Sequence, residues 1–261
     1  MASITSNLKE SLAYPFNDLK KFGVIFILNM IIFSLIIASN YIFVNFLREL
    51  ITHNNISNIN LVLNNQVSIE VAILQIIAFI ISIFILGYIY EVIGNSIEKN
   101  NQLPKFNIKK LFINGIKVEI INIIYMIIPL ALIQIAISYD LTIILVIGII
   151  LAIILALIEI MAIDNMVANK TIKAAFDFKG IIEKIKSIGY LTYVGGIIFY
   201  EFSYFIIFCS LFVIMILILP IIILLSIYGV LIIYAILFSA VYSYVLISQA
   251  HLYGALYNLA E

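Results

Sequence analysis

The sequence predicts an all-α fold: a polytopic membrane helix bundle of about six transmembrane helices arranged as three hairpins, with short amphipathic interfacial helices on the cytoplasmic side. Hydrophobic residues make up 65% of the 261 residues and charged residues only 11%, and the mean hydropathy is +1.22. A soluble domain is about half apolar and a quarter charged, and its outer surface must be polar. The apolar residues also gather in long runs, separated by loops of which only alternate ones are rich in lysine. Lipid is therefore the solvent that suits this chain.

The apolar runs define a single integral membrane domain over residues 1–261. An apolar helix of about 20 residues crosses the hydrocarbon core. The stretch from Gly189 to Ile247 is too long for one span, and Pro220 and Gly229 both interrupt helices readily, so we expect the last hairpin to turn between them. Isoleucine-rich runs are not interpreted as strands, because an open sheet cannot face lipid. The expected spans are 22–46, 71–93, 120–139, 141–163, 189–218 and 222–247.

The basic residues predict the orientation. Of the 14 Lys and Arg residues, all except Arg48 fall on alternate segments, which are the amino-terminal segment and the loops before the third and fifth spans. Under the positive-inside rule these segments are cytoplasmic. We therefore expect a multi-pass protein of the cell (plasma) membrane with both termini in the cytoplasm. The formal net charge of zero gives no indication of nucleic-acid binding.

A short amphipathic segment precedes each predicted hairpin, at residues 16–21, 106–111 and 176–181. In the last of these, apolar residues from Phe178 to Ile188 recur at helical spacing, with lysines mostly opposite. Such helices lie in the headgroup plane with their lysines toward anionic lipid. An open alternative is that the lysines only fix the topology. The candidate contacts with lipid or a partner are Lys109, Lys110, Lys184 and Lys186.

The sequence contains no motif of a zinc protease, nucleophile elbow, phosphate loop or dinucleotide-binding fold. His53 and His251 are predicted on opposite sides of the membrane, so they cannot share a metal ion. The single cysteine, Cys209, lies inside an apolar run. We therefore expect no enzyme activity, no cofactor and no metal.

Glu201 is the main candidate for an intramembrane polar site. It lies twelve residues after Gly189, about 18 Å along a helix, and a charge at mid-membrane costs about 2.5–3.5 kcal/mol on insertion scales. Two interpretations remain open at this point. Glu201 either serves a proton or cation path, or shares a hydrogen bond with Tyr204, Ser203 or Gln134.

A stripe of small residues follows one face of the fourth predicted span. Gly148, Ala152 and Ala156 recur every four residues, and small side chains at this spacing allow helices to approach closely. We expect the stripe to pack inside the bundle, with a dimer seam as the alternative.

A series of short motifs occurs in a consistent order along the chain. They are Tyr14-Pro15-Phe16-x-Asp18, Leu103-Pro104-x-Phe106, Leu111-Phe112, Gly115, Tyr125, Pro129, Ala174-Ala175-Phe176-Asp177-Phe178 and Ala250-x-Leu252-Tyr253-Gly254-x-x-Tyr257. Together they resemble the domain of unknown function 4013 family. Glu91 departs from the family pattern, because a basic residue is expected shortly after Gly87-Tyr88. The resemblance implies a multi-span membrane protein of archaeal origin and implies no activity.

These features favour a non-enzymatic membrane bundle that interacts with lipid or protein partners through its basic cytoplasmic segments. The alternative is a small-solute or ion transporter or channel that uses Glu201. The expected partners are the lipid bilayer, including anionic headgroups, but not nucleic acid. A membrane-protein partner and a homo-oligomer both remain open.

Overall fold

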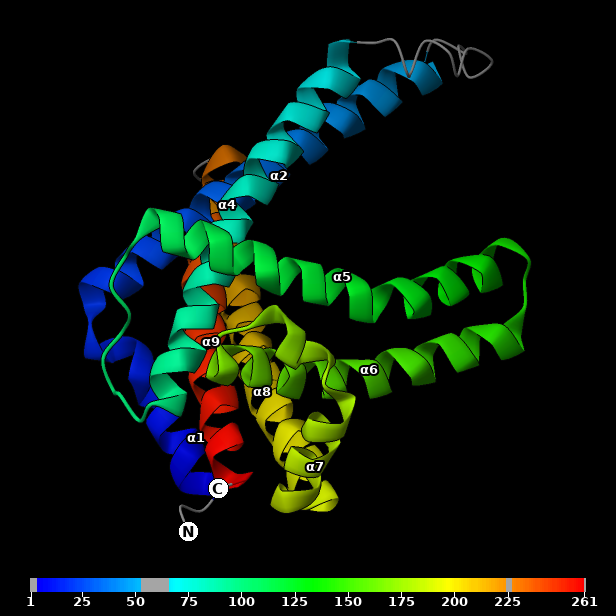
Figure 1. Ribbon diagram of the computed structural model, residues 1–261. Helices are drawn as coiled ribbons and strands as arrows, with labels where there is room; N and C mark the ends of the chain where they lie inside the picture. The colour runs from blue at the N-terminus through cyan, green and yellow to red at the C-terminus, as the bar shows by residue number, and fades with distance from the viewer. Residues whose placement is uncertain (1–3, 53–65, 224–226, 261) are drawn as a thin grey trace.

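The computed structural model describes residues 4–52, 66–223 and 227–260, and this part of the chain is all-helical, without a strand (Figure 1). It therefore confirms the predicted fold class. The elements are α1 (Ile4–Ala13), η1 (Tyr14–Asn17), α2 (Leu19–Thr52), α4 (Gln66–Ile97), α5 (Ile108–Ser138), α6 (Thr142–Asn169), η2 (Ile172–Phe176), α7 (Phe178–Ile188), α8 (Tyr190–Ile223), α9 (Ile227–Tyr257) and η3 (Asn258–Ala260).

Six helices in the described residues are long and apolar enough to cross a membrane: α2, α4, α5, α6, α8 and α9. Each extends past the apolar run that predicted it, since helical hydrogen bonding continues into the polar flanks. α5, for example, begins at Ile108, where the Asn107 side chain accepts a hydrogen bond from the Lys110 backbone N–H. This N-cap starts the helix twelve residues before the predicted span.

The three predicted amphipathic segments form different structures. The third becomes a separate helix, α7, which ends at Gly189 with a φ of 93°. Glycine adopts this left-handed conformation without steric cost. The second segment runs directly into α5 as its first turns, and the first forms η1 and the start of α2. Among the three segments, only the third therefore forms a separate amphipathic helix, as predicted.

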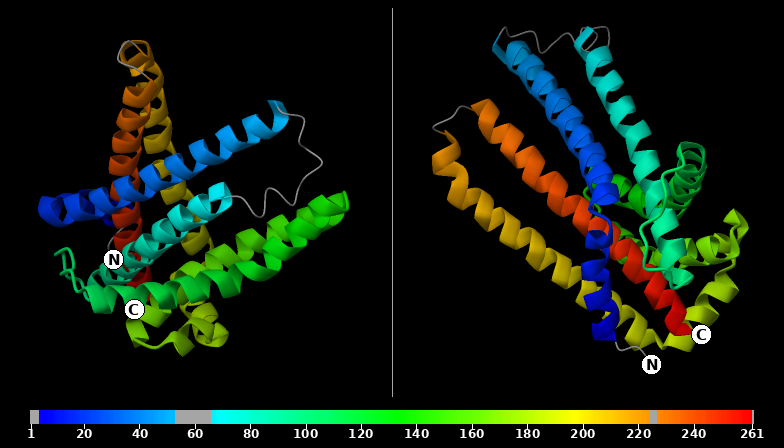
Figure 2. Two further views of the ribbon diagram at one scale, coloured as in Figure 1. Left: turned by 90° about the horizontal axis from the view of Figure 1, so that it is seen from above. Right: turned by 90° about the vertical axis from the view of Figure 1, so that its left-hand side faces the viewer.

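The spanning helices pair as three hairpins, α2 with α4, α5 with α6 and α8 with α9, which diverge from a shared end (Figures 1 and 2). α1, α7 and the carboxyl end of α9 lie there, and we name it the basal end. α8 ends at Ile223 and α9 begins at Ile227, inside the interval predicted for the last turn. The residues of that turn lie outside the described part of the chain, and Pro220 lies within α8.

α9 contacts α1, α2, α4, α6 and α8, so it organises the basal end. Its Gly254 lies against α4, where a Cβ atom would stand 2.6 Å from the Ile93 carbonyl oxygen. Of the small-residue stripe, Gly148 is buried against α5, where a Cβ would stand 2.9 Å from Ile133 Cγ1, whereas Ala152 and Ala156 are half-buried. Close backbone approach thus fixes two of the helix contacts.

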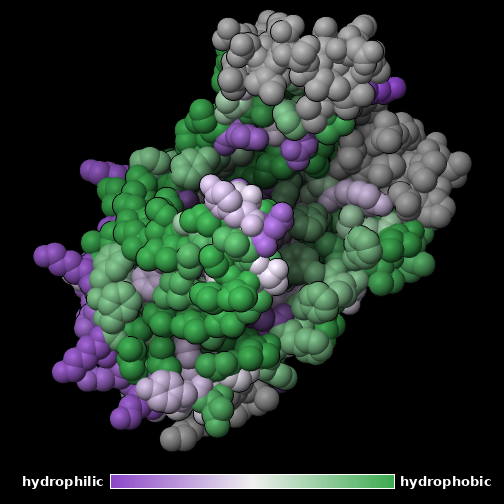
Figure 3. All heavy atoms as spheres, turned by 90° about the vertical axis from the view of Figure 1, so that its right-hand side faces the viewer, coloured by the Kyte–Doolittle hydropathy of each residue, from purple (hydrophilic) through white to green (hydrophobic). Residues whose placement is uncertain are grey.

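Away from the basal end, the helices expose large apolar side chains. α6 is the extreme case, with Ile143, Ile147, Ile150 and Ile154 all largely exposed. Figure 3 looks onto the side from which the α5–α6 hairpin projects and shows a mainly hydrophobic surface, with hydrophilic residues gathered along one edge. Such a surface suits contact with lipid.

Candidate functional site

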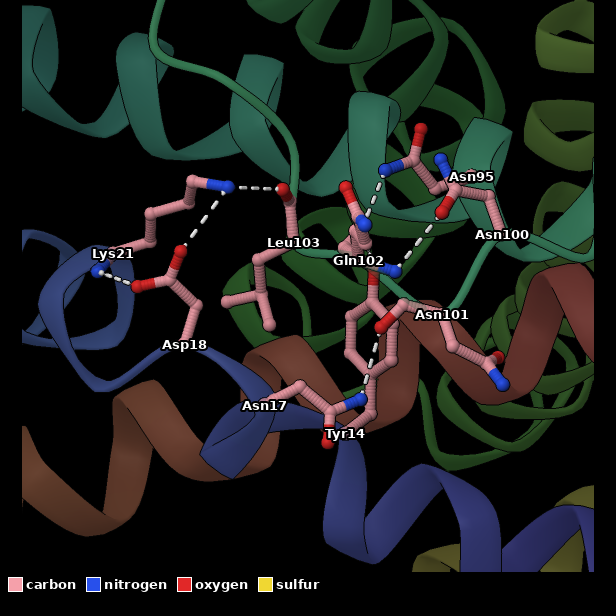
Figure 4. A network of polar contacts seen from close by, with 9 residues as sticks. All are labelled: Tyr14, Asn17, Asp18, Lys21, Asn95, Asn100, Asn101, Gln102 and Leu103. Atoms are coloured by element: carbon pink, nitrogen blue, oxygen red, sulfur yellow. Dashed lines mark hydrogen bonds and ion pairs between the residues drawn. The ribbon is translucent and has the colours of Figure 1, made fainter.

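At the basal end, the segment after α1 binds the connection between α4 and α5 (Figure 4). Burial raises the pKa of Tyr14 to about 12, so its hydroxyl remains a donor at neutral pH. Three hydrogen bonds join these two segments, which lie more than eighty residues apart in the chain. Three side chains donate to successive carbonyl oxygens: Tyr14 Oη to Gln102 (2.8 Å), Asn17 Nδ2 to Asn101 (2.9 Å) and Lys21 Nζ to Leu103 (2.6 Å).

His251 in α9 packs against this segment. The Tyr14 and His251 ring centroids are 4.1 Å apart, and Ser11 Oγ lies 2.8 Å from His251 Nδ1. A serine beside a histidine is also the pairing of a nucleophile and its base. Ser11, however, has no exposed surface, so a substrate could not reach its oxygen, and the contact instead attaches α1 to α9.

Lys110, one of the predicted contact residues, is held by Glu91 of α4. Its Nζ lies 2.6 Å from Glu91 Oε2, and Asn114 Nδ2 donates to Glu91 Oε1 at 2.7 Å. The acid that departs from the family pattern therefore pairs with a lysine on the next helix. The adjacent pocket has a volume of about 340 Å³ and also receives Lys117 and the ion pair of Lys170 with Glu98. Lys109 and Lys110 are both exposed.

α7 carries apolar side chains on two adjoining faces. Ile181 and Ile185 are buried in the core, whereas Phe178 is 50% exposed and Ile182 is 46% exposed. At about 100° per residue, Lys179 and Lys186 lie beside this exposed pair. The sequence pattern predicted one apolar face, but the structure divides it into a face toward protein and a face toward the surroundings.

Lys184, the remaining predicted contact residue, lies on the other side of α7. Its Nζ is 4.1 Å from the centroid of the Tyr257 ring, within the range of a cation–π contact. Tyr257 Oη in turn donates to Asn165 Oδ1 at 3.1 Å. Lys184 and Tyr257 both line an open polar groove of about 550 Å³ between α6 and α7. Asp177 and Glu183 line the same groove.

Glu201 in α8 accepts hydrogen bonds from α9. Gln249 Nε2 donates to both carboxylate oxygens, at 3.1 and 3.2 Å, and Tyr253 Oη donates to Oε1 at 2.7 Å. Tyr204 is buried and lines the same groove as Glu201. Gln134 is exposed on α5, in the hairpin that projects away from α8 and α9 (Figure 1). The structure thus brings Glu201 and Tyr204 to one groove, but not Gln134.

Asp164 in α6 is a buried acid that the sequence did not single out. It is 1% exposed, and neither carboxylate oxygen has a hydrogen-bond partner among the described residues. Glu159, five residues earlier on the same helix, is only half-buried. A polar residue next to Asn165 in an apolar run was the one available signal.

Metal-binding chemistry has no evident site in the described residues, where no three or more His, Cys, Asp and Glu side chains gather closely enough to hold an ion. Cys209 is exposed on α8 and is a free thiol.

A family model described as a protein of unknown function, DUF4013, matches residues 71–219, which is more than half of the chain. The match runs from α4 into α8 and contains the motif residues from Leu103 to Pro129. Neither a curated protein nor a solved structure matches the chain significantly. With six helices that could span a membrane and this match, the chain is a multi-pass membrane protein that belongs to the DUF4013 family.

Proposed function

We propose that this protein is a non-enzymatic membrane bundle that binds anionic lipid headgroups at its basal end, through α7. The sequence left lipid and protein partners open, and the two faces of α7 favour lipid. The proposal places the basal end and both termini in the cytoplasm of an archaeal cell, with the bundle in the plasma membrane. The lysine distribution, with α1 and the carboxyl end of α9 both at the basal end, supports this orientation (Figure 1).

The observation that carries the proposal is the exposed pair Phe178 and Ile182 on a helix that is already anchored to the core. Ile181 and Ile185 attach α7 to the protein core. Phe178 and Ile182 can therefore contact lipid while α7 stays packed against the bundle. An apolar edge beside lysines is the arrangement with which interfacial helices enter the boundary between headgroups and acyl chains.

The exposed lysines of α7 favour an anionic lipid headgroup, because their positive charge is opposite to its own. Lys179 and Lys186 are exposed on the same side as Phe178 and Ile182, where their ammonium groups can reach phosphate oxygens while the apolar pair enters the acyl region. A lysine near an anionic leaflet contributes about 1 kcal/mol. Two such lysines therefore contribute about 2 kcal/mol, or roughly thirtyfold in affinity.

The test uses the purified full chain and native mass spectrometry with added phosphatidylglycerol or phosphatidylcholine. The Lys179→Gln/Lys186→Gln variant should lose most phosphatidylglycerol binding, roughly thirtyfold, and keep its phosphatidylcholine binding. Lys184→Gln is the matched control, because Lys184 lies over Tyr257 on the other side of the same helix. Unchanged phosphatidylglycerol binding in the double variant, or an equal loss in the control, would contradict the proposal.

A further inference from the structure

A groove between α8 and α9 is not explained by lipid binding at the basal end. Its volume of about 690 Å³ falls in the range of small-molecule sites, about 300–1,000 Å³. Its floor and walls come from both helices and are mostly apolar. The lining residues are Ile197, Ile198, Glu201, Phe202, Tyr204, Phe205, Phe208, Tyr242, Val245, Leu246 and Gln249.

The groove contains one acidic residue, Glu201, and no basic partner for it in the lining. All three hydrogen bonds to Glu201 come from neutral donors, two from the Gln249 amide and one from the Tyr253 hydroxyl. No Lys, Arg or His is among the lining residues. Because the lining around Glu201 is mostly apolar and holds no basic side chain, a cation bound there would pair with the carboxylate without competition.

Aromatic side chains make up about half of the lining, and most of the other lining residues are aliphatic. Phe202 is 59% exposed and Phe205 is 61% exposed, and Phe208, Tyr204 and Tyr242 continue the lining. Aromatic faces attract organic cations through their ring quadrupoles, most strongly where water is excluded. A carboxylate next to such side chains is therefore suited to a ligand that is both charged and apolar.

We propose that this groove binds a lipophilic organic cation, with its positive centre at Glu201 and its apolar part along Phe202 and Phe205. An inorganic cation fits less well, because Ca²⁺ and Mg²⁺ take six or more oxygen ligands and Glu201 is the only carboxylate in the lining. An anionic lipid headgroup would be repelled by the same carboxylate. The ligand class is thus set by one charge and an extended aromatic surface.

The experiment compares two probes of the same shape and opposite charge, tetraphenylphosphonium and tetraphenylborate. The full chain is reconstituted in nanodiscs of neutral lipid, and binding is measured by isothermal titration calorimetry against empty nanodiscs. We expect saturable binding of tetraphenylphosphonium at one site and none of tetraphenylborate. Equal binding of both probes would mean that the groove only accepts apolar bulk, and it would overturn the proposal.

Three variants locate the site. Glu201→Gln should weaken tetraphenylphosphonium binding at least tenfold, and Phe205→Ala should weaken it severalfold; both side chains are exposed, so neither change should disturb folding. Glu183→Gln, which removes an exposed acid from α7, should leave the affinity unchanged. Full affinity in Glu201→Gln, or an equal loss in Glu183→Gln, would overturn the assignment. Because Lys179 and Lys186 do not line this groove, either proposal can fail without the other.

Discussion

Gly87 of α4 lies against the backbone carbonyl of Leu111 in α5, so that a Cβ atom on Gly87 would stand 1.8 Å from that oxygen. The contact is reciprocal, because a Cβ atom on Gly115 of α5 would stand 1.8 Å from the Ile83 carbonyl oxygen. No side chain fits between the two helices at this crossing. The α4–α5 contact therefore depends on a glycine from each helix, as in other close helix crossings in membranes.

Gly87→Ala should separate α4 from α5 and lower the free energy of unfolding by about 3 kcal/mol, the upper part of the usual range for overpacking. The measurement is thermal unfolding in detergent. Gly195→Ala is the control, because a Cβ on Gly195 would meet nothing within 4 Å. It should leave stability unchanged or raise it by up to about 1 kcal/mol. Equal stability of Gly87→Ala and the wild type would show that the crossing is not as tight as described.

Lys110→Ala should lower stability by about 1 kcal/mol, whereas Lys109→Ala should change it by less than about 0.5 kcal/mol. The Lys110 ammonium group pairs with Glu91, although its own side chain is 60% exposed and the pair is partly screened by solvent. A double-mutant cycle with Glu91→Gln, read by unfolding in detergent, measures the coupling. If the stability losses of Lys110→Ala and Glu91→Gln simply add in the double variant, the ion pair contributes no coupling energy.

Asp18 makes the basal end sensitive to acid. The Lys21 backbone N–H, with its side chain, holds the pKa of the Asp18 carboxyl below its ordinary value of 3.8. A carboxyl whose folded pKa is lowered stabilises the fold above its unfolded pKa, and the contribution is lost as the pH falls through the folded pKa. The melting temperature should therefore fall less between about pH 7 and about pH 3 in Asp18→Asn than in the wild type. Parallel curves would rule out this contribution.

Ser11→Ala should loosen α1. The change removes the hydrogen-bond partner of His251 Nδ1 at a buried position, and such a loss costs about 1–3 kcal/mol. Limited proteolysis should cut α1 faster in this variant. Ser34→Ala, at an exposed serine that bonds the Met30 carbonyl oxygen of its own helix, should be cut at the wild-type rate. The same cutting rate in both variants would mean that the Ser11–His251 contact does not hold α1.

The features that follow from local sequence were predictable. Runs of apolar residues predicted six spans, since the length of a helix across lipid is fixed by the bilayer. The spacing from Phe178 to Ile188 predicted an amphipathic helix, because neighbours on a helix face are three and four residues apart. The division of its apolar side between core and surroundings was not predictable, because it depends on which helices pack against Ile181 and Ile185.

Contacts between residues far apart in the chain could not be predicted from the sequence, for a physical reason. Partners for Glu201 were sought at Ser203 and Tyr204, on its own helix, and at Gln134, but its hydrogen bonds come from Gln249 and Tyr253. Nothing in one helix specifies the register in which a helix fifty residues later packs against it. Asp164 was missed on the same grounds, because its burial becomes apparent only when the neighbouring helices are in place.

The contacts of α9 also set the order in which the protein can be assembled. The α2–α4 and α5–α6 hairpins can each enter the membrane as they leave the ribosome, since each pairs with its own neighbour in the chain. α1 must wait, because His251, with which Ser11 pairs, is made more than two hundred residues later. The contact between the amino-terminal helix and α9 can therefore form only after the last helix has been made.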